Sequence, residues 1–257
     1  MPTKVSILAL SAAALCAATA PAFADADFAR QRFGEMSAYL GGQEALSFDY
    51  DASLDVVTDE GQILTIASSG TVAMERPGKL AATRDGGFAS VAFSFDGASL
   101  TVLNRDENVY AKADIPGSVE HLIDELRDTY QRPLPAADLL LPDVEGALGP
   151  LFTDVKDLGS GVIGGVECDH LAFRTEVADM QIWIAQGADP YPCRYSISNT
   201  EVEHAPQYVL QIHGWSTGAD AAAAPAVEIP ADAREVAPDE VPDLDDLAGI
   251  YVVEGAN

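Results

Sequence analysis

The sequence predicts an α+β fold in which an antiparallel sheet of about eleven strands is combined with a few helices. Two long blocks, 46–114 and 152–215, alternate apolar and polar side chains with a period of two and are broken by short turn signals. One helical pattern precedes the first block, and a second helical segment separates the two blocks. Short strands at hairpin spacing favour antiparallel pairing, so we expect one sheet built from about six strands and then about five.

The first 24 residues have the pattern of a secretory signal peptide. Lys4 is their one charged residue, an apolar run follows from Val5 to Ala18, and Ala22 and Ala24 occupy the small-residue positions before a cleavage site. We therefore predict secretion, with cleavage between Ala24 and Asp25.

Two other interpretations of this segment fit less well. The apolar run is short for a membrane anchor, because a spanning helix needs about 20 apolar residues. A lipoprotein signal requires a small residue just before the cysteine, whereas Leu15 precedes Cys16. No later segment resembles a transmembrane helix, so we expect no stable membrane insertion.

The composition is strongly acidic, since 41 Asp and Glu against 14 Lys and Arg give a formal net charge of −27. A chain with this charge is repelled by nucleic acids and by anionic lipid headgroups. We therefore expect no nucleic-acid partner. With 48% hydrophobic residues, the 257-residue chain has enough apolar side chains for a sizeable core.

The predicted elements begin with a helix over Asp25–Gly42, where Phe33, Met36 and Leu40 are spaced three and four apart before a pair of glycines. About six strands follow up to Asp114.

The segment between the two strand blocks is predicted to be helical. Ser118–Tyr130 has a serine at the N-cap position and an apolar stripe made by Leu122, Ile123 and Leu126. Shorter helical turns are expected over Leu134–Asp143 and Val144–Phe152.

About five more strands run to Trp215, and Val227–Val236 is expected to add an edge strand and a cap. Residues 237–257 are rich in Asp, Glu and Pro and are predicted to form a disordered acidic tail. The chain thus divides into a signal peptide (1–24), one folded domain (25–236) and a tail (237–257).

Cleavage would remove Cys16 and leave Cys168 and Cys193. An even pair in an oxidising compartment predicts a disulfide, and the alternative is two buried free thiols. A metal site is not expected there, because His170 is the nearest histidine and nothing completes a set of four ligands.

Two motifs resemble known sites but fit them poorly. Asp49, Asp51, Ser53 and Asp55 alternate as in a calcium loop, but Leu54 stands where such a loop needs glycine, so we interpret them as the solvated face of a strand. Residues 159–164, GSGVIG, match a dinucleotide-binding pattern, but a strand follows instead of a helix, which favours a hairpin turn. With no catalytic motif, we expect a protein that is not an enzyme and needs no cofactor.

The opposite, apolar face of the first strands is the more informative one. It is either an ordinary core covered by the two longer helices, or the lining of a half-open barrel whose concave face is only partly filled. The residues predicted to line such a cavity are Leu46, Phe48, Tyr50, Leu64, Ile66, Phe93 and Phe95.

Five segments of the chain resemble one protein family: RFGEMSAYL, LPAADLL, GGVECDHLAFR, MQIWIAQGADPYPCRYSI and PQYVLQIHGW. They are similar to predicted periplasmic proteins of domain-of-unknown-function family 2092, which resembles the LolA/LolB superfamily of lipoprotein carriers. The similarity spans roughly Phe28 to Val236. It implies a periplasmic location and a half-open antiparallel barrel with helices as a lid over an apolar cavity. It also implies the pairing of Cys168 with Cys193, whereas the carriers' functional residues do not align with this chain.

These observations predict a periplasmic, non-catalytic binding protein whose ligand is a lipid or a lipoprotein acyl chain. Leu122, Ile123 and Leu126 would form the inner side of the lid helix. The alternative is a periplasmic protein-interaction or sensing module that has a filled core and a protein partner. A large apolar void between sheet and helices would favour the first function, and a close-packed core the second.

Overall fold

The computed structural model describes residues 26–58, 60–132, 134, 136–242 and 244. Its described strands form one open sheet of twelve, in the order β12-β6-β5-β4-β3-β2-β1-β11-β10-β9-β8-β7. The neighbouring strands are antiparallel, apart from β12, which runs parallel to β6. The strands are β1 (Ala45–Val57), β2 (Ile63–Glu75), β3 (Lys79–Gly86), β4 (Ser90–Phe95), β5 (Ser99–Asn104), β6 (Val109–Asp114), β7 (Asp154–Ile163), β8 (Val166–Arg174), β9 (Ala178–Ala185), β10 (Pro192–Asn199), β11 (Gln207–Thr217) and β12 (Arg234–Glu235).

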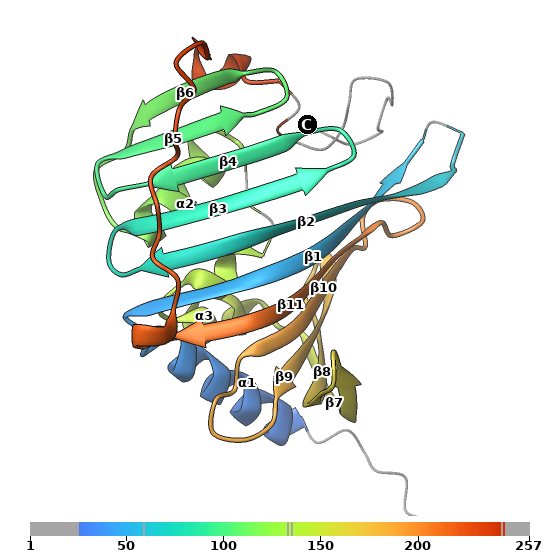
Figure 1. Ribbon diagram of the computed structural model, residues 1–257. Helices are drawn as coiled ribbons and strands as arrows, with labels where there is room; N and C mark the ends of the chain where they lie inside the picture. Colours follow the sequence, from blue (N-terminus) through green and yellow to red (C-terminus); the bar gives the residue numbers. More distant parts are fainter. Residues whose placement is uncertain (1–25, 59, 133, 135, 243, 245–257) are drawn as a thin grey trace, which may run out of the picture.

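Helices α1, α2 and α3 lie on one side of this curved sheet, as Figure 1 shows. The fold class predicted from the sequence, an unclosed antiparallel sheet combined with covering helices, is therefore confirmed. The predicted hydrogen bond at the start of α2 is present, because the Ser118 hydroxyl accepts from the backbone N–H of His121 at 3.3 Å. The helices are α1 (Ala26–Gly41), α2 (Val119–Asp128), α3 (Val144–Leu148) and the 3-10 helices η1 (Ala137–Leu140), η2 (Gly149–Leu151), η3 (Gly218–Asp220) and η4 (Pro238–Glu240).

The side chains of β1 alternate between the two faces of the sheet. Leu46 pairs with Met74 of β2, and the alternation places Leu46 and Phe48 on the face toward the helices. Asp49 and Asp51 project from the opposite face and are exposed, and the Ser69 hydroxyl donates to the Asp51 carboxylate at 2.6 Å. We call these the inner and the outer face. The aspartates thus belong to a strand, as predicted.

The segment predicted to be a hairpin turn, residues 159–164, is mostly strand, because residues 159–163 belong to β7 and the turn itself is Gly164 and Gly165. Gly164 and Gly165 have φ angles of 57° and 88°. Two successive residues in the left-handed region are the requirement of a type I′ hairpin turn, and glycine adopts this conformation without a steric penalty.

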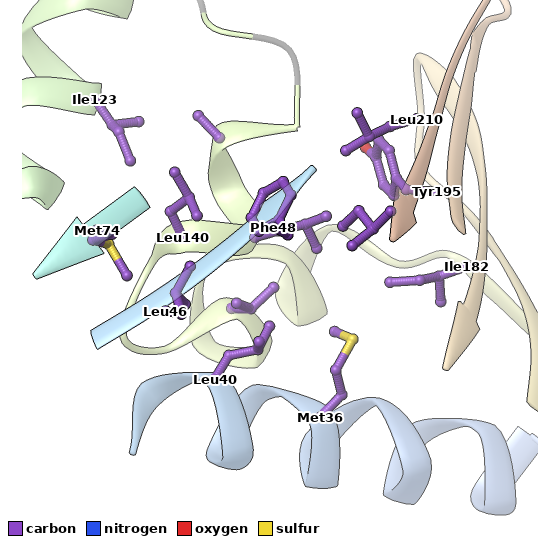
Figure 2. Packing of buried hydrophobic residues seen from close by; sticks show 14 of the residues in the cluster. Met36, Leu40, Leu46, Phe48, Met74, Ile123, Leu140, Ile182, Tyr195 and Leu210 are labelled. Atoms are coloured by element: carbon purple, nitrogen blue, oxygen red, sulfur yellow. The ribbon is translucent and has the colours of Figure 1, made fainter. Parts of the chain in front are cut away.

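The inner face and the helices share one hydrophobic core (Figure 2). Met36 and Leu40 project from α1 toward Leu46 and Phe48 of β1. The strands of the second block add Ile182 and other residues from β9, β10 and β11 to the same cluster. None of the described helices is long and apolar enough to cross a membrane.

After β11 the chain runs across the outer face, where it is drawn in orange and red in Figure 1. Residues 218–233 form this outer strap. The backbone N–H of Ala222 donates to the Ser47 hydroxyl at 2.8 Å, and that of Val227 donates to the Ser94 hydroxyl at 2.9 Å. Strand β12 then pairs with β6 at the edge of the sheet. It is the edge strand predicted within Val227–Val236.

Residues 236–242 and 244, the C-terminal segment, continue from the edge onto the inner face. The Asn104 side-chain amide donates to the carbonyl of Pro242 at 2.9 Å, and Arg84 donates to the carbonyl of Leu244 at 2.7 Å. The sequence predicts a disordered tail from residue 237, whereas residues 237–242 and 244 pack against the sheet. The reason is that Val241 and Leu244 find apolar partners on β6. Residues 245–257 and the predicted signal peptide lie outside the described residues.

Candidate ligand-binding site on the inner face

The structure brings most of the predicted ligand-binding residues together on the inner face. Leu46, Phe48 and Phe95 are buried in the main core, and Tyr50 and Phe93 pack against it half-buried. Phe48 stacks on Trp215 of β11 with 5.6 Å between ring centroids. These side chains therefore form one continuous apolar surface.

Leu64 and Ile66 lie apart from this surface. They pair with Val56 and Leu54 near the far end of β1, are half-buried, and do not belong to the main core in the described part of the chain. The alternation predicts their face correctly, but it contains no information about which part of a long strand the helices cover.

Gly70 makes room for Tyr50. The two residues pair across β1 and β2, and a Cβ on Gly70 would lie 2.8 Å from the Tyr50 ring and 1.9 Å from the carbonyl of Thr83. The Tyr50 hydroxyl donates to that carbonyl at 3.0 Å. A side chain at position 70 would therefore displace the tyrosine from the inner face.

Helix α2 covers the inner face with the predicted apolar stripe. Leu122, Ile123 and Leu126 are all buried in the main core. The N-terminal end of the helix is fixed to the sheet, because the backbone N–H of Val119 donates to the carbonyl of Pro77 at 2.8 Å. The C-terminal end leads to Tyr130, which packs half-buried against the core.

Arg76 connects three parts of the helical layer to β2. Its guanidinium donates to the Glu120 carboxylate of α2 at 3.0 Å, to the carbonyl of Leu140 in η1 at 2.8 Å and to the carbonyl of Gln43 at 3.2 Å. The Arg76 side chain is only 13% exposed. Burial lowers the pKa of its guanidinium, and Glu120 opposes that shift. Arginine nevertheless stays charged, so these contacts are charge-assisted.

A second buried arginine fixes α1. Arg32 donates to the Asp169 carboxylate of β8 at 2.7 Å and to the carbonyl of Ala185 at 2.5 Å. Asp169 follows Cys168, which forms the predicted disulfide with Cys193. This end of the sheet is thus held by a covalent and an ionic link.

Neither arginine was among the predicted site residues. Arg32 lies four residues before Met36, in line with the apolar stripe of α1, and a charge at a stripe position is a signal for a buried ion pair. Arg76 stands in the turn signal ERPGK, where composition indicates only a break between strands.

Two ionisable groups report the apolar character of the inner face. Burial raises the pKa of Tyr195, and burial also raises the pKa of the Asp138 carboxyl in η1. Both groups therefore favour their neutral forms. Among the described residues, no three His, Cys, Asp or Glu side chains gather as metal ligands.

An apolar cavity of about 60 Å³ remains between the inner face and the C-terminal end of α2. Its walls come from β5, β6, α2 and the C-terminal segment. The lining residues are Leu100, Val102, Ala111, Lys112, Ala113, Leu126, Tyr130, Arg132, Pro238, Val241 and Leu244.

A larger cavity of about 870 Å³ lies on the outer face beneath the strap. Its floor is made of short side chains such as Thr71, Ala81 and Thr83, and strap residues such as Ala223 and Val227 form its roof. Its lining is a mixture of polar and apolar surface, whereas the cavity under α2 is lined almost wholly by apolar surface. The inner face is therefore the better candidate for an apolar ligand.

Comparisons with solved structures return proteins of low sequence identity. The lipoprotein LppX of Mycobacterium tuberculosis is 16% identical, with a TM-score of 0.44, and the match covers 79% of this chain and 99% of LppX. LprF from Mycobacterium bovis is 11% identical, with a TM-score of 0.46 and coverage of 82% and 99%. The Pseudomonas aeruginosa MucA/MucB complex is matched at 13% identity with a TM-score of 0.43, over 76% of this chain and 59% of that one.

At these identities and scores, the solved structures do not indicate what this chain binds. No curated protein matches its sequence. A family model does match, over residues 29–237, and is described as "Predicted periplasmic protein (DUF2092)". The chain therefore belongs to this family of predicted periplasmic proteins, as its sequence motifs indicate.

Proposed function

We propose that the chain is a periplasmic, non-catalytic binding protein for an apolar ligand, a lipid or an acyl chain, which enters between the inner face and α2. The observation that carries the proposal is the continuous apolar surface of the inner face. It ends in an apolar cavity under one end of α2. Apolar concave surfaces of this kind are the usual sites for such ligands.

The ligand requires α2 and η1 to move. Ligand pockets usually enclose about 300–1,000 Å³, whereas the cavity under α2 holds about 60 Å³. The N-terminal end of α2 is tied to the sheet at Pro77, so its C-terminal end is the part free to swing. In this proposal α2 and η1 form a lid. Arg76 is its latch, because it holds η1 through the carbonyl of Leu140 and the hinge end of α2 through Glu120.

A second candidate function is a protein-interaction or sensing module. It is favoured by the close packing of the core, in which Leu46, Leu122 and Ile182 have no exposed surface. In that case the inner face serves stability alone, and a protein partner binds elsewhere on the surface.

The latch provides the test. Arg76→Ala removes two charge-assisted hydrogen bonds between β2 and the lid, which should raise the open fraction about ten-fold or more. Titration with dansyl-labelled undecanoic acid, followed by fluorescence, should give a correspondingly lower apparent Kd for the variant than for the parent chain. Arg174→Ala is the matched control, because it breaks an exposed pair with Asp179 that does not touch the helices.

Equal affinity of Arg76→Ala and the parent would contradict the lid. If neither protein binds the dansyl-labelled acid, and a pull-down yields one stoichiometric protein partner, the interaction module is the correct function.

A further inference from the structure

The C-terminal segment closes the side of the inner face that α2 leaves open. Val241 is 4% exposed and packs on Val109 and Ala111 of β6, each 3% exposed. Pro238, Val241 and Leu244 form one wall of the apolar cavity, and α2 forms another through Leu126. Without this segment, the cavity would open to solvent along the β6 edge.

We propose that the C-terminal segment, residues 236–242 and 244, is an intramolecular gate, which covers the entry of the ligand site and must leave before an apolar chain can enter. This inference rests on the proposed function, and it adds a regulatory contact to the same site. The gate competes with the ligand, so any event that pulls the C-terminal segment away increases the affinity of the site.

The way the segment is attached supports a gate over a permanent part of the core. Its apolar contacts belong to a small cluster with Val109 and Ala111, separate from the main core. The two-residue strand β12 leads into the segment. The N–H of Arg234 donates to the carbonyl of Asn108, and that of Val236 donates to the carbonyl of Tyr110. Segments with few apolar contacts and edge hydrogen bonds open locally, without global unfolding.

The inner face holds the gate with a prearranged donor. Asn104 is 1% exposed, and its side-chain oxygen accepts the backbone N–H groups of Asp106 and Glu107 at 3.0 and 3.1 Å. These two bonds hold the Asn104 side chain in one orientation within the β5–β6 turn. In that orientation its amide N–H₂ donates to the carbonyl of Pro242 at 2.9 Å. The segment thus closes onto a site that keeps its shape when the gate leaves.

The position of the gate matches the motion of the lid. The fixed end of α2 lies at Pro77, and the gate lies against the opposite end, near Leu126 and Tyr130. Because Val241 and Leu126 line the same cavity, we expect a ligand that widens this cavity to displace the gate together with the free end of α2.

The test measures directly how often the gate opens. It uses the full chain with Cys16→Ser, in which an introduced cysteine is the one free thiol because Cys168 and Cys193 are paired. Ala111→Cys places that thiol under Val241. Adding Val241→Asp should speed its labelling by iodoacetamide at least ten-fold, because a buried carboxylate destabilises the closed gate. Val227→Asp, on the outer strap, is the matched control and should leave the rate within two-fold.

Ala29→Cys, on the buried face of α1, detects global unfolding. Its labelling rate should not change with Val241→Asp. An unchanged rate at Ala111→Cys would overturn the gate. Equal acceleration at both cysteines would also overturn it, because the segment would then open only with the whole domain.

Ligand binding is measured separately on the same variants. Val241→Asp should bind dansyl-labelled undecanoic acid at least ten-fold more tightly than the parent chain. If Val241→Asp speeds the labelling of Ala111→Cys but the acid does not bind, the result supports an opening gate and contradicts the proposed apolar ligand. The two failures are therefore distinguishable.

Discussion

Leu46 and Leu64 occupy the same face of neighbouring strands and differ in what covers them. Leu46 lies under α1 with no exposed surface, whereas Leu64 is half-buried at the far end of β2. Truncation of a fully buried leucine removes transfer free energy and leaves a cavity, while truncation at a half-buried site lets solvent and neighbours fill the gap.

We therefore predict different losses of stability. Leu46→Ala should lower the free energy of unfolding by about 2–5 kcal/mol, and Leu64→Ala by about 1 kcal/mol or less. Urea titration followed by circular dichroism measures both. Similar losses for the two variants would show that the helices cover β2 further than the structure indicates.

Single-residue environments divide into those that the sequence predicts and those that it does not. Alternation along β1 predicts which side chains share the inner face, because the period of a strand is fixed at two. It does not predict the contacts of Arg32 or Arg76. Each depends on partners more than 40 residues away, namely Asp169 and Glu120, which only the folded sheet brings close.

At the scale of elements, η1 of the lid contains a partly buried carboxyl group, that of Asp138. Burial in the closed lid disfavours the ionised form of this group. Burial raises the pKa of Asp138 in η1 above the value of an exposed carboxyl. The folded state therefore binds this proton more tightly than the unfolded state. Its stabilising effect is complete below the unfolded pKa, near 3.9, and is lost as the pH rises through the folded pKa.

Relative to the parent chain, Asp138→Asn should accordingly be more stable at pH 7 than at pH 3, because the variant has no carboxyl proton whose stabilising effect is lost as the pH rises. Urea midpoints at the two pH values provide the comparison. Asp114→Asn, an exposed acid at the end of β6, is the control and should change neither midpoint appreciably. A loss of stability for Asp138→Asn at pH 7 would indicate that the carboxylate makes a favourable contact in the lid.

Most elements could be predicted from the sequence, because helices and strands have different periods and glycine pairs mark their ends. The C-terminal segment could not. Its acidic and proline-rich composition resembles disorder, and the partners of Val241 and Leu244 lie on β6, more than 100 residues earlier in the chain. Such contacts leave no local pattern.

At the scale of the whole molecule, one open sheet is closed by three different covers. Helix α1 is held to it by Arg32, the lid by Arg76, and the remaining side by the C-terminal segment. The first lies beside a disulfide, whereas among the described residues no covalent link lies beside the other two. This difference in attachment is why we place ligand entry between the lid and the C-terminal segment.

The central claim is that the inner face binds an apolar ligand, and native mass spectrometry of the chain purified under mild conditions from a bacterial periplasm tests it most directly. We predict a fraction of protein carrying a non-covalent adduct of a few hundred daltons, a size that fits ligand pockets of this kind. Organic extraction should remove the adduct, and Arg76→Ala should increase its occupancy. A spectrum that shows the bare chain alone for both proteins, together with no binding of dansyl-labelled undecanoic acid, would contradict the claim.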